Sequence, residues 1–103
     1  MNVRVLHYRI KPDKLDEYLS LFAGVKERVA GMDGINFFKL FRDLEDPNLL
    51  CLVAVFEDKL DLERYNEIGP NQEYTDAVMP LIEGFDMAMV YDVSAANPLS
   101  FGE

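Results

Sequence analysis

The sequence is poor in cysteine: Cys51 is the single one among its 103 residues. No disulfide can form within the chain, and disulfides are rare in reducing compartments but common in small secreted domains. This shortage favours a cytoplasmic location. The thiol lies in the middle of an apolar run, so we expect it to behave as a small hydrophobic side chain rather than as a nucleophile.

Basic residues are also in the minority, because ten Lys and Arg stand against nineteen Asp and Glu, for a formal charge of −9. A negative protein repels phosphate backbones and anionic lipid surfaces, so neither nucleic acid nor a membrane is expected as a partner. No apolar run is long enough to span a bilayer. The first ten residues alternate like a strand and lack the basic region and apolar block of a signal peptide.

Apolar residues are plentiful, since half of the chain is hydrophobic and 12% is aromatic. A chain of this length and composition can bury one core. We therefore expect a single domain over residues 1–93. Residues 94–103 are expected to form a C-terminal tail, because Pro98 and Gly102 argue against regular structure there.

The first half of the chain predicts one helix and three strands. Residues 3–10 alternate like a strand, which Lys11-Pro12-Asp13 ends. Residues 35–43 and 49–57 predict two more strands, joined by the turn-rich segment 44–48, which is short enough for an antiparallel hairpin. Between the first two strands, apolar residues recur at steps of three and four, as in an amphipathic helix. They are Leu15, Tyr18, Leu19, Phe22, Val25 and Val29.

The second half predicts a broken helix and a closing strand. Residues 59–68 read as a short helix, Gly69-Pro70 breaks it, and residues 71–84 read as a second helical stretch. Residues 85–93 predict the last strand. The order β-α-β-β-α-β is the ferredoxin-like pattern, an α+β fold with a four-stranded antiparallel sheet and helices on one face.

The other face of this sheet should be polar if the chain works alone, because an antiparallel sheet with one wet side alternates in polarity. Residues 49–56 are instead almost uninterrupted apolar sequence, and Phe37 and Phe41 lie opposite Phe38 and Leu40 on their strand. A second copy of the same sheet is the simplest cover, since self-complementary dimers are the commonest oligomers. We therefore expect a homodimer.

Residues 42–65, RDLEDPNLLCLVAVFEDKLDLERY, together with the preceding helix and Met32-Asp33-Gly34, resemble the antibiotic biosynthesis monooxygenase family. The resemblance spans residues 3–93, and its most specific piece is residues 42–48 followed by the strand and Phe56-Glu57-Asp58. It implies a dimeric α/β barrel with a small pocket between the helices and the sheet of each subunit. Some relatives oxidise quinol-like or polyketide aromatics there without metal or flavin, so no cofactor is expected.

Several positions depart from the pattern of that family. Near the end of the third strand many relatives have Glu, a hydrophobic residue and Trp, where this chain has Ala54, Val55 and Phe56. Tyr65 stands where His or Trp is common, and an ordinary tyrosine pKa of about 10 makes it a poor base unless its surroundings lower that value. The haem-degrading branch places an iron-binding His where register puts Val78. Valine cannot bind iron, so haem degradation by that mechanism is not expected.

The candidate site residues are those that could supply a base, hydrogen-bond donors and a dry cavity. The catalytic candidates are Tyr65 and His7, the only histidine. The register of the family turns Tyr8 toward the helices and His7 away from them, so His7 could instead be a structural residue inside the dimer. Asn36 could hold a substrate oxygen or lie on the surface, and the tyrosines could simply pack in the core. The substrate-binding candidates are Tyr8, Asn36, Phe38, Phe56 and Tyr74.

Two functions remain open from the sequence. The first is a cofactor-independent monooxygenase acting on a small aromatic or quinol-type metabolite. The second is a non-catalytic small-molecule-binding or stress-related dimeric barrel protein, which the loss of the family Trp and of a second His would permit. No metal is expected in either, because the acidic runs 43–46 and 57–63 lack the Gly and ligand spacing of a calcium loop.

Overall fold

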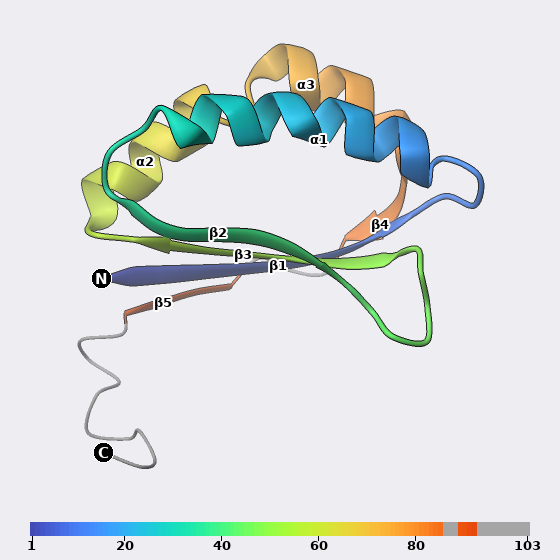
Figure 1. The fold of residues 1–103 in the computed structure, drawn as a ribbon, viewed down its shortest axis with the longest axis horizontal. Helices are drawn as coiled ribbons and strands as arrows, with labels where there is room; N and C mark the ends of the chain where they lie inside the picture. The colour runs from blue at the N-terminus through green and yellow to red at the C-terminus, as the bar shows by residue number, and fades with distance from the viewer. Residues whose placement is uncertain (86–88, 93–103) are drawn as a thin grey trace.

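A computed structural model describes residues 1–85 and 89–92 of the chain (Figure 1). The tail expected over residues 94–103 lies outside this described part. Helices lie above a sheet, in the order that the sequence predicts. The elements are β1 (Asn2–Ile10), α1 (Leu15–Ala30), β2 (Ile35–Arg42), β3 (Leu49–Phe56), α2 (Lys59–Ile68), α3 (Gln72–Val78), the 3-10 turn η1 (Met79–Leu81), β4 (Ile82–Phe85) and β5 (Met89–Asp92).

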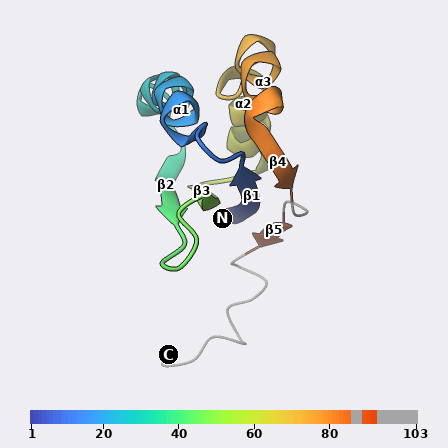
Figure 2. The same ribbon diagram turned by 90° about the vertical axis from the view of Figure 1, so that its right-hand side faces the viewer.

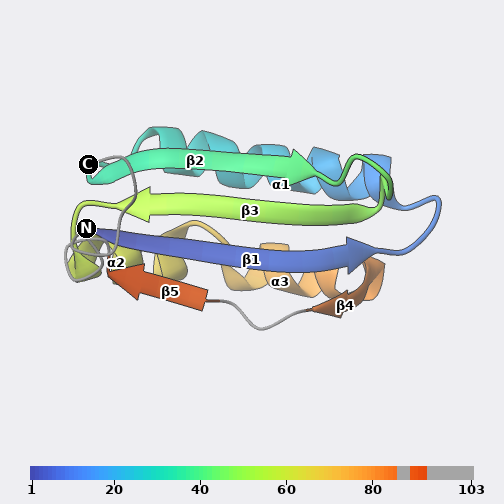
Figure 3. The same cartoon turned by 90° about the horizontal axis from the view of Figure 1, so that it is seen from below.

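The sheet has the strand order β2-β3-β1-β4, and β5 also pairs with β1, further along the same edge (Figure 3). Every described strand pair is antiparallel. The β1–β3 register sets Leu6 opposite Leu52 and His7 opposite Cys51. Because side chains alternate between the faces, the two leucines share the helix-covered face, and His7 and Cys51 share the other. The ferredoxin-like α+β fold is therefore confirmed.

The end of the chain differs in detail from its prediction. The second helical stretch, expected to reach residue 84, ends at Val78, and β4 already begins at Ile82. Pro80 gives the physical reason, because it has no N–H to donate and its ring would clash with the carbonyl group four residues earlier in a continued α-helix. The expected strand over residues 85–93 is seen in part, as the end of β4 and as β5, and the residues between and after them lie outside the described part.

The helices cover one face of the sheet, and the core lies between the two layers (Figures 1 and 2). The apolar stripe predicted for α1 faces this core, with Tyr18, Phe22, Val25 and Val29 buried. Among the described residues, no helix is both long and apolar enough to cross a bilayer. The remaining buried apolar residues are Tyr8, Ile10, Leu50, Leu52, Ala54, Phe56, Leu62, Tyr65, Val78 and Leu81.

Two side-chain caps fix where α2 and α3 begin. The Asp58 carboxylate accepts a hydrogen bond from the Asp61 N–H at 3.1 Å, and the Asn71 side-chain oxygen accepts one from the Tyr74 N–H at 2.9 Å. Each cap satisfies an N–H group that the helix itself leaves unpaired. Since Tyr65 and Tyr74 lie on these helices, the caps help to position two of the candidate site residues.

Gly34 turns the chain from α1 into β2 with a φ of 82°, in the left-handed region that favours glycine. A Cβ at this position would lie 2.2 Å from the Cγ of the buried Asp61 on α2. Both the backbone conformation and the space next to α2 therefore require a glycine here.

The second face of the sheet is left uncovered by the described elements, as the view from below shows (Figure 3). Phe37 and Phe41 on this face remain 38% and 45% exposed. Alternation along the paired strands places the apolar side chains Val3, Val5, Leu49, Cys51, Val53 and Val55 on it as well. The expectation of a second copy over this face therefore stays open.

Candidate functional site

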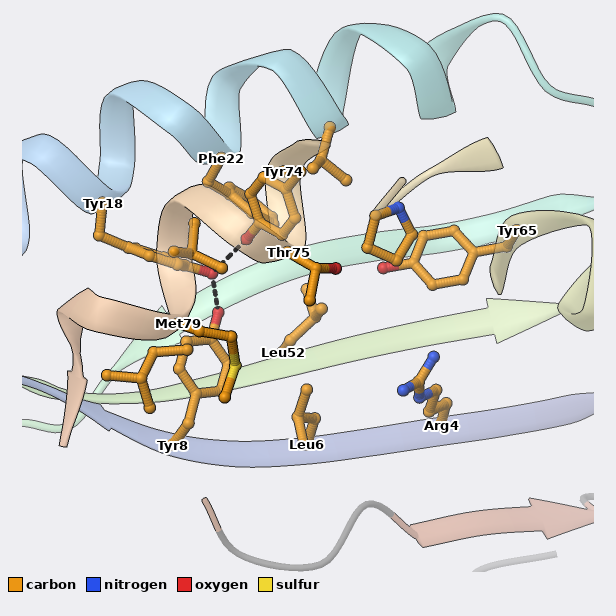
Figure 4. Close-up of a pocket in the computed structure, with 14 residues that line it drawn as sticks. Arg4, Leu6, Tyr8, Tyr18, Phe22, Leu52, Tyr65, Tyr74, Thr75 and Met79 are labelled. Carbon is orange, nitrogen blue, oxygen red and sulfur yellow. Dashed lines mark hydrogen bonds between the residues drawn. The ribbon is translucent and has the colours of Figure 1, made fainter. Parts of the chain in front are cut away.

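A cavity of about 220 Å³ lies between the sheet and the helices (Figure 4). Its fourteen lining residues come from β1, β3 and β4 below, and from the helices and Pro70, which lies between α2 and α3, above. Pockets for drug-sized molecules usually measure about 300–1,000 Å³. This cavity therefore suits a molecule smaller than a typical drug.

Three tyrosines from three different elements meet at one end of the cavity. The Tyr74 hydroxyl of α3 donates a hydrogen bond to the Tyr18 hydroxyl of α1 at 3.0 Å. The same Tyr18 oxygen forms a hydrogen bond with the Tyr8 hydroxyl of β1. This chain of hydroxyls ties the sheet to two helices (Figure 4).

Tyr65 and Arg4 face the other part of the cavity (Figure 4). Tyr65 is only 3% exposed, its hydroxyl points into the cavity toward Thr75, and no residue in the described part makes a hydrogen bond with it. The Arg4 guanidinium carbon lies 5.9 Å from the centre of the Tyr65 ring, and Arg4 donates to the side-chain oxygen of Asn66 at 2.5 Å. This part of the cavity thus offers a hydroxyl and a cation.

Burial raises the pKa of all four tyrosines in the cavity wall. Loss of hydration raises the pKa of Tyr65 to about 12, although the positive charge of Arg4 acts in the opposite direction. The pKa values of Tyr8, Tyr18 and Tyr74 are raised as well, with burial the largest cause in each case. All four phenols are neutral at pH 7, so they can donate hydrogen bonds but cannot take up a proton as bases.

The described cavity lining contains no Asp, Glu, His or Cys. Within the described part of the chain, no group of three or more such residues is placed to hold a metal ion. Val78, where register places the iron-binding His of the haem-degrading branch, is buried in the cavity wall. The polar groups that the described wall offers are therefore hydroxyls and a guanidinium, and the most common proton acceptors are missing from it.

Five of the seven residues predicted for the site gather in or behind this cavity. Tyr8, Tyr65 and Tyr74 line it directly. Phe38 and Phe56 pack behind Tyr65, with ring centres 5.7 and 5.4 Å from the Tyr65 ring. The two phenylalanines thus support a lining residue and do not themselves line the cavity.

His7 and Asn36 lie elsewhere. His7 is exposed on the second face of the sheet, where it borders a separate hollow with Phe41 and Cys51. Asn36 is exposed too, and its amide donates to the Glu57 carboxylate at 2.8 Å. Because the sheet separates His7 from Tyr65, the two catalytic candidates cannot act on one bound molecule within a single chain.

Arg4, Tyr18 and Thr75 line the cavity but were not among the predicted site residues. Arg4 shares the alternation of β1 with Tyr8, and this signal could have identified it. Tyr18 was assigned only to the core, because it belongs to the apolar stripe of α1. For Thr75 the sequence offers no signal other than its place beside Tyr74.

The same fold occurs in solved structures of low sequence identity. A conserved protein from Methanosarcina mazei superposes with a TM-score of 0.79 at 18% identity, over 88% of this chain and 91% of the other. A protein of Nitrosomonas europaea, proposed to be an antibiotic biosynthesis monooxygenase, gives a TM-score of 0.81 at 17% identity, over 89% and 97% of the two chains. A Deinococcus radiodurans protein with the same proposed identity gives 0.79 at 12% identity, over 89% and 91%. These similarities show the fold alone.

A comparison with curated proteins finds no match. The sequence model of the antibiotic biosynthesis monooxygenases, in contrast, matches residues 1–77. This range runs from β1 into α3 and includes Arg4, Tyr18, Tyr65 and Tyr74. The chain therefore belongs to the antibiotic biosynthesis monooxygenase family.

Proposed function

We propose that the protein is a cofactor-independent monooxygenase that acts on a small aromatic or quinol-type metabolite, bound between the sheet and the helices. The observation that carries this proposal is a largely apolar cavity whose polar groups are hydroxyl donors and one guanidinium. Membership of the family supports the reaction type. The size of the cavity supports a substrate smaller than a typical drug molecule.

Molecular oxygen is the oxidant in this proposal, and the substrate is the reductant. An anthrone-type substrate gives up a proton of its ring CH₂ group to bulk water and binds as the enolate, whose carbanionic carbon gives one electron to O₂. The two radicals combine into a C–O–O⁻ peroxide, which takes up a proton. Loss of the second C–H proton then breaks the O–O bond, so that CH₂ and O₂ become C=O and H₂O.

The protein contributes position and a dry environment to this reaction. Leu6 and Leu52 in the floor keep water from the reacting carbon. The Tyr65 hydroxyl donates a hydrogen bond to an oxygen on the substrate ring, where negative charge accumulates after the proton is lost. The tyrosine chain around Tyr18 closes the opposite end of the cavity.

The proposed working unit is a cytoplasmic homodimer, in which residues 1–93 form the domain and residues 94–103 a tail. The apolar second face of the sheet supports the dimer, because monomers rarely leave such a continuous apolar surface in water. No membrane or nucleic acid takes part in this proposal.

A non-catalytic small-molecule-binding or stress-related role is the second candidate. It is favoured by the missing carboxylates and imidazole in the described cavity wall, since a catalysed proton abstraction usually needs such a group. In this alternative the same cavity holds its ligand without turnover.

Oxygen uptake with a panel of anthrones and hydroquinones tests the enzyme proposal. We expect uptake above the uncatalysed rate at pH 7, and a fall in kcat/KM of at least about tenfold for Tyr65→Phe, which keeps the ring but removes the donor. Ser20→Ala changes an exposed residue of α1 and serves as the matched control with the wild-type rate.

Two outcomes would contradict this assignment. Uptake no greater than the uncatalysed rate across the panel, with saturable binding of the same compounds in equilibrium dialysis, would leave the binding role. A loss of activity in His7→Ala but not in Tyr65→Phe would move the reaction to the second face of the sheet.

A further inference from the structure

Arg4 is a half-buried cation in the wall of an otherwise largely apolar cavity. Its guanidinium is held in place by the hydrogen bond to Asn66 and by its position over the Tyr65 ring. Among the described residues Arg4 forms no ion pair with a carboxylate. A guanidinium keeps its charge at every accessible pH, so this part of the cavity carries a fixed positive charge.

The Tyr65 hydroxyl lies in the same part of the cavity and points into it (Figure 4). The residue is 97% buried, since only 3% of its surface is exposed, and the described residues offer its hydroxyl no hydrogen-bond partner. The oxygen itself is open to the cavity, because the described part of the structure holds no fully buried side-chain donor or acceptor without a partner. A ligand acceptor placed here would therefore take the place of water at this donor.

The elements around this part of the cavity bring no described negative charge to it. The strand β3 contributes only the apolar Leu52 to the wall. The titratable and charged groups in the wall are Arg4 and Tyr8 of β1, Tyr18 of α1, Tyr65 of α2 and Tyr74 of α3. The tyrosines are neutral at pH 7 because burial raises their pKa values. The described wall therefore holds one positive charge and no compensating anion.

We propose that the cavity binds its aromatic ligand as an oxyanion, a phenolate or enolate, with the charged oxygen between the Arg4 guanidinium and the Tyr65 hydroxyl. This inference rests on the proposed function, because it assigns the ionisation state in which the substrate of that site is held. It also assigns the ligand class, which is a small aromatic compound with a weakly acidic hydroxyl group.

The ligand hydroxyl loses its proton without a basic side chain in the described cavity wall to accept it. The ligand O–H bond breaks and its proton passes to water, while Arg4 and Tyr65 stabilise the electron pair that stays on the oxygen. An opposite charge within about 4–6 Å lowers the pKa of an acid by about 1–3 units. The site thus replaces a base with a charge that makes the ligand itself more acidic.

A nitrophenol probe tests the inference directly, because 4-nitrophenolate absorbs visible light and the neutral phenol does not. We would titrate the probe with pH in the presence of saturating protein and follow the phenolate absorbance. The expected result is an apparent pKa of the bound probe at least about one unit below that of the free probe. Arg4→Gln should reduce this shift to less than half of the wild-type shift.

Two controls separate the charge from other effects. Lys11→Gln removes a cation from an exposed position just after β1 and should leave the shift unchanged. 4-Nitroanisole has the same ring as 4-nitrophenol but cannot ionise. At a pH above the pKa of bound 4-nitrophenol, the wild-type protein should therefore bind 4-nitroanisole at least tenfold more weakly than 4-nitrophenol. This second comparison needs no variant, and it holds even where Arg4→Gln fails to fold.

A bound probe whose pKa equals or exceeds that of the free probe would overturn the inference, as would nitroanisole binding as tightly as nitrophenolate. Failure of the proposed enzyme activity is a separate outcome. If the pKa of the bound nitrophenol is lowered as expected but no oxygen is taken up with anthrones, the monooxygenase proposal is rejected and the anion site is retained. If oxygen is taken up but the pKa of the bound nitrophenol is not lowered, the anion site is rejected and the monooxygenase proposal is retained.

Discussion

The phenol of Tyr65 packs against the rings of Phe38 and Phe56 and presents its hydroxyl to the cavity. These apolar neighbours keep water away from the phenol and so stabilise its neutral form. The sequence identified Tyr65 as a site residue but left its role open between donor and base. Its surroundings in the structure make it a donor.

The raised pKa of Tyr65 makes the stability of the protein depend on alkaline pH. Its ordinary value is 10.0, the value expected in the unfolded chain, and its value in the fold is about 12. A raised pKa contributes stability that is complete below pH 10 and is lost as the pH rises toward 12. At about 1.4 kcal/mol per unit, we expect Tyr65 to contribute a loss of about 2–3 kcal/mol in the free energy of unfolding over this range.

Urea unfolding followed by circular dichroism at pH 8, 9, 10 and 11 measures the first part of this loss, about half of which is expected by pH 11. Tyr65→Phe is the matched control, because it keeps the ring and removes the ionisable group. Its free energy of unfolding should fall less steeply above pH 10 than that of the wild type. Identical pH dependence in the two proteins would show that Tyr65 is not the buried phenol described above.

Gly34 and Gly24 should respond in opposite directions to the same substitution. Gly34→Ala places a Cβ 2.2 Å from Asp61 and forces a φ of 82° on alanine, so we expect a loss of about 1–3 kcal/mol in stability. Gly24 lies within α1, where an added Cβ would meet nothing closer than the end of the Arg28 side chain at 3.6 Å. Gly24→Ala should therefore stabilise the protein by about 0.4–1 kcal/mol.

Thermal unfolding of both variants provides the measurement. Asp61→Ala combined with Gly34→Ala separates the two causes, since it removes the clash and leaves the unfavourable φ. We expect the double variant to lose less stability than the sum of the two single losses. A Gly34→Ala protein as stable as the wild type would contradict the described turn.

At the scale of elements, the regular patterns and the helix break at Gly69-Pro70 could be predicted from the sequence, but the early end of the second helical stretch could not. Six apolar residues at helical spacing predicted α1, and alternating residues predicted β1. The early start of β4 at Ile82 depends on its pairing with Ile10, a contact between distant parts of the chain. Local propensity around Pro80 does not contain that information.

The candidate site was predictable to a similar degree. Tyrosines on β1 and on the broken helix could be selected by residue type, and Tyr8, Tyr65 and Tyr74 do meet at one cavity. The place of Arg4 depends on how far α2 stands from β1, because the guanidinium needs Asn66 and the Tyr65 ring beside it. Packing distances between elements cannot be obtained from one sequence.

The whole molecule has one face covered by helices and one apolar face that the described elements leave open. Because a second copy would cover the open face, we expect a dimer, and light scattering should give twice the chain mass of 11.8 kDa. Val53→Lys should raise the dimer dissociation constant at least about tenfold. The new ammonium would lie in the middle of the open face and opposite Lys39, its cross-strand neighbour with the same charge.

Leu60→Lys is the matched control for this substitution. It introduces the same charge at a residue of α2 that is 66% exposed, away from the open face of the sheet, and should leave the dimer intact. A monomer mass for the wild-type protein would reject the dimer outright. Equal effects of the two substitutions would move the interface away from this face.

The aromatic composition of the cavity wall also gives the protein an optical property. The sequence has five tyrosines and no tryptophan, and four of the five tyrosines line the cavity. Neighbouring rings from Tyr8 through Phe22 and Phe38 to Tyr65 have centres 5.5 to 6.1 Å apart. Most of the intrinsic ultraviolet fluorescence therefore comes from around the cavity, and a quinone that enters it would quench that emission, so the unlabelled protein reports its own occupancy.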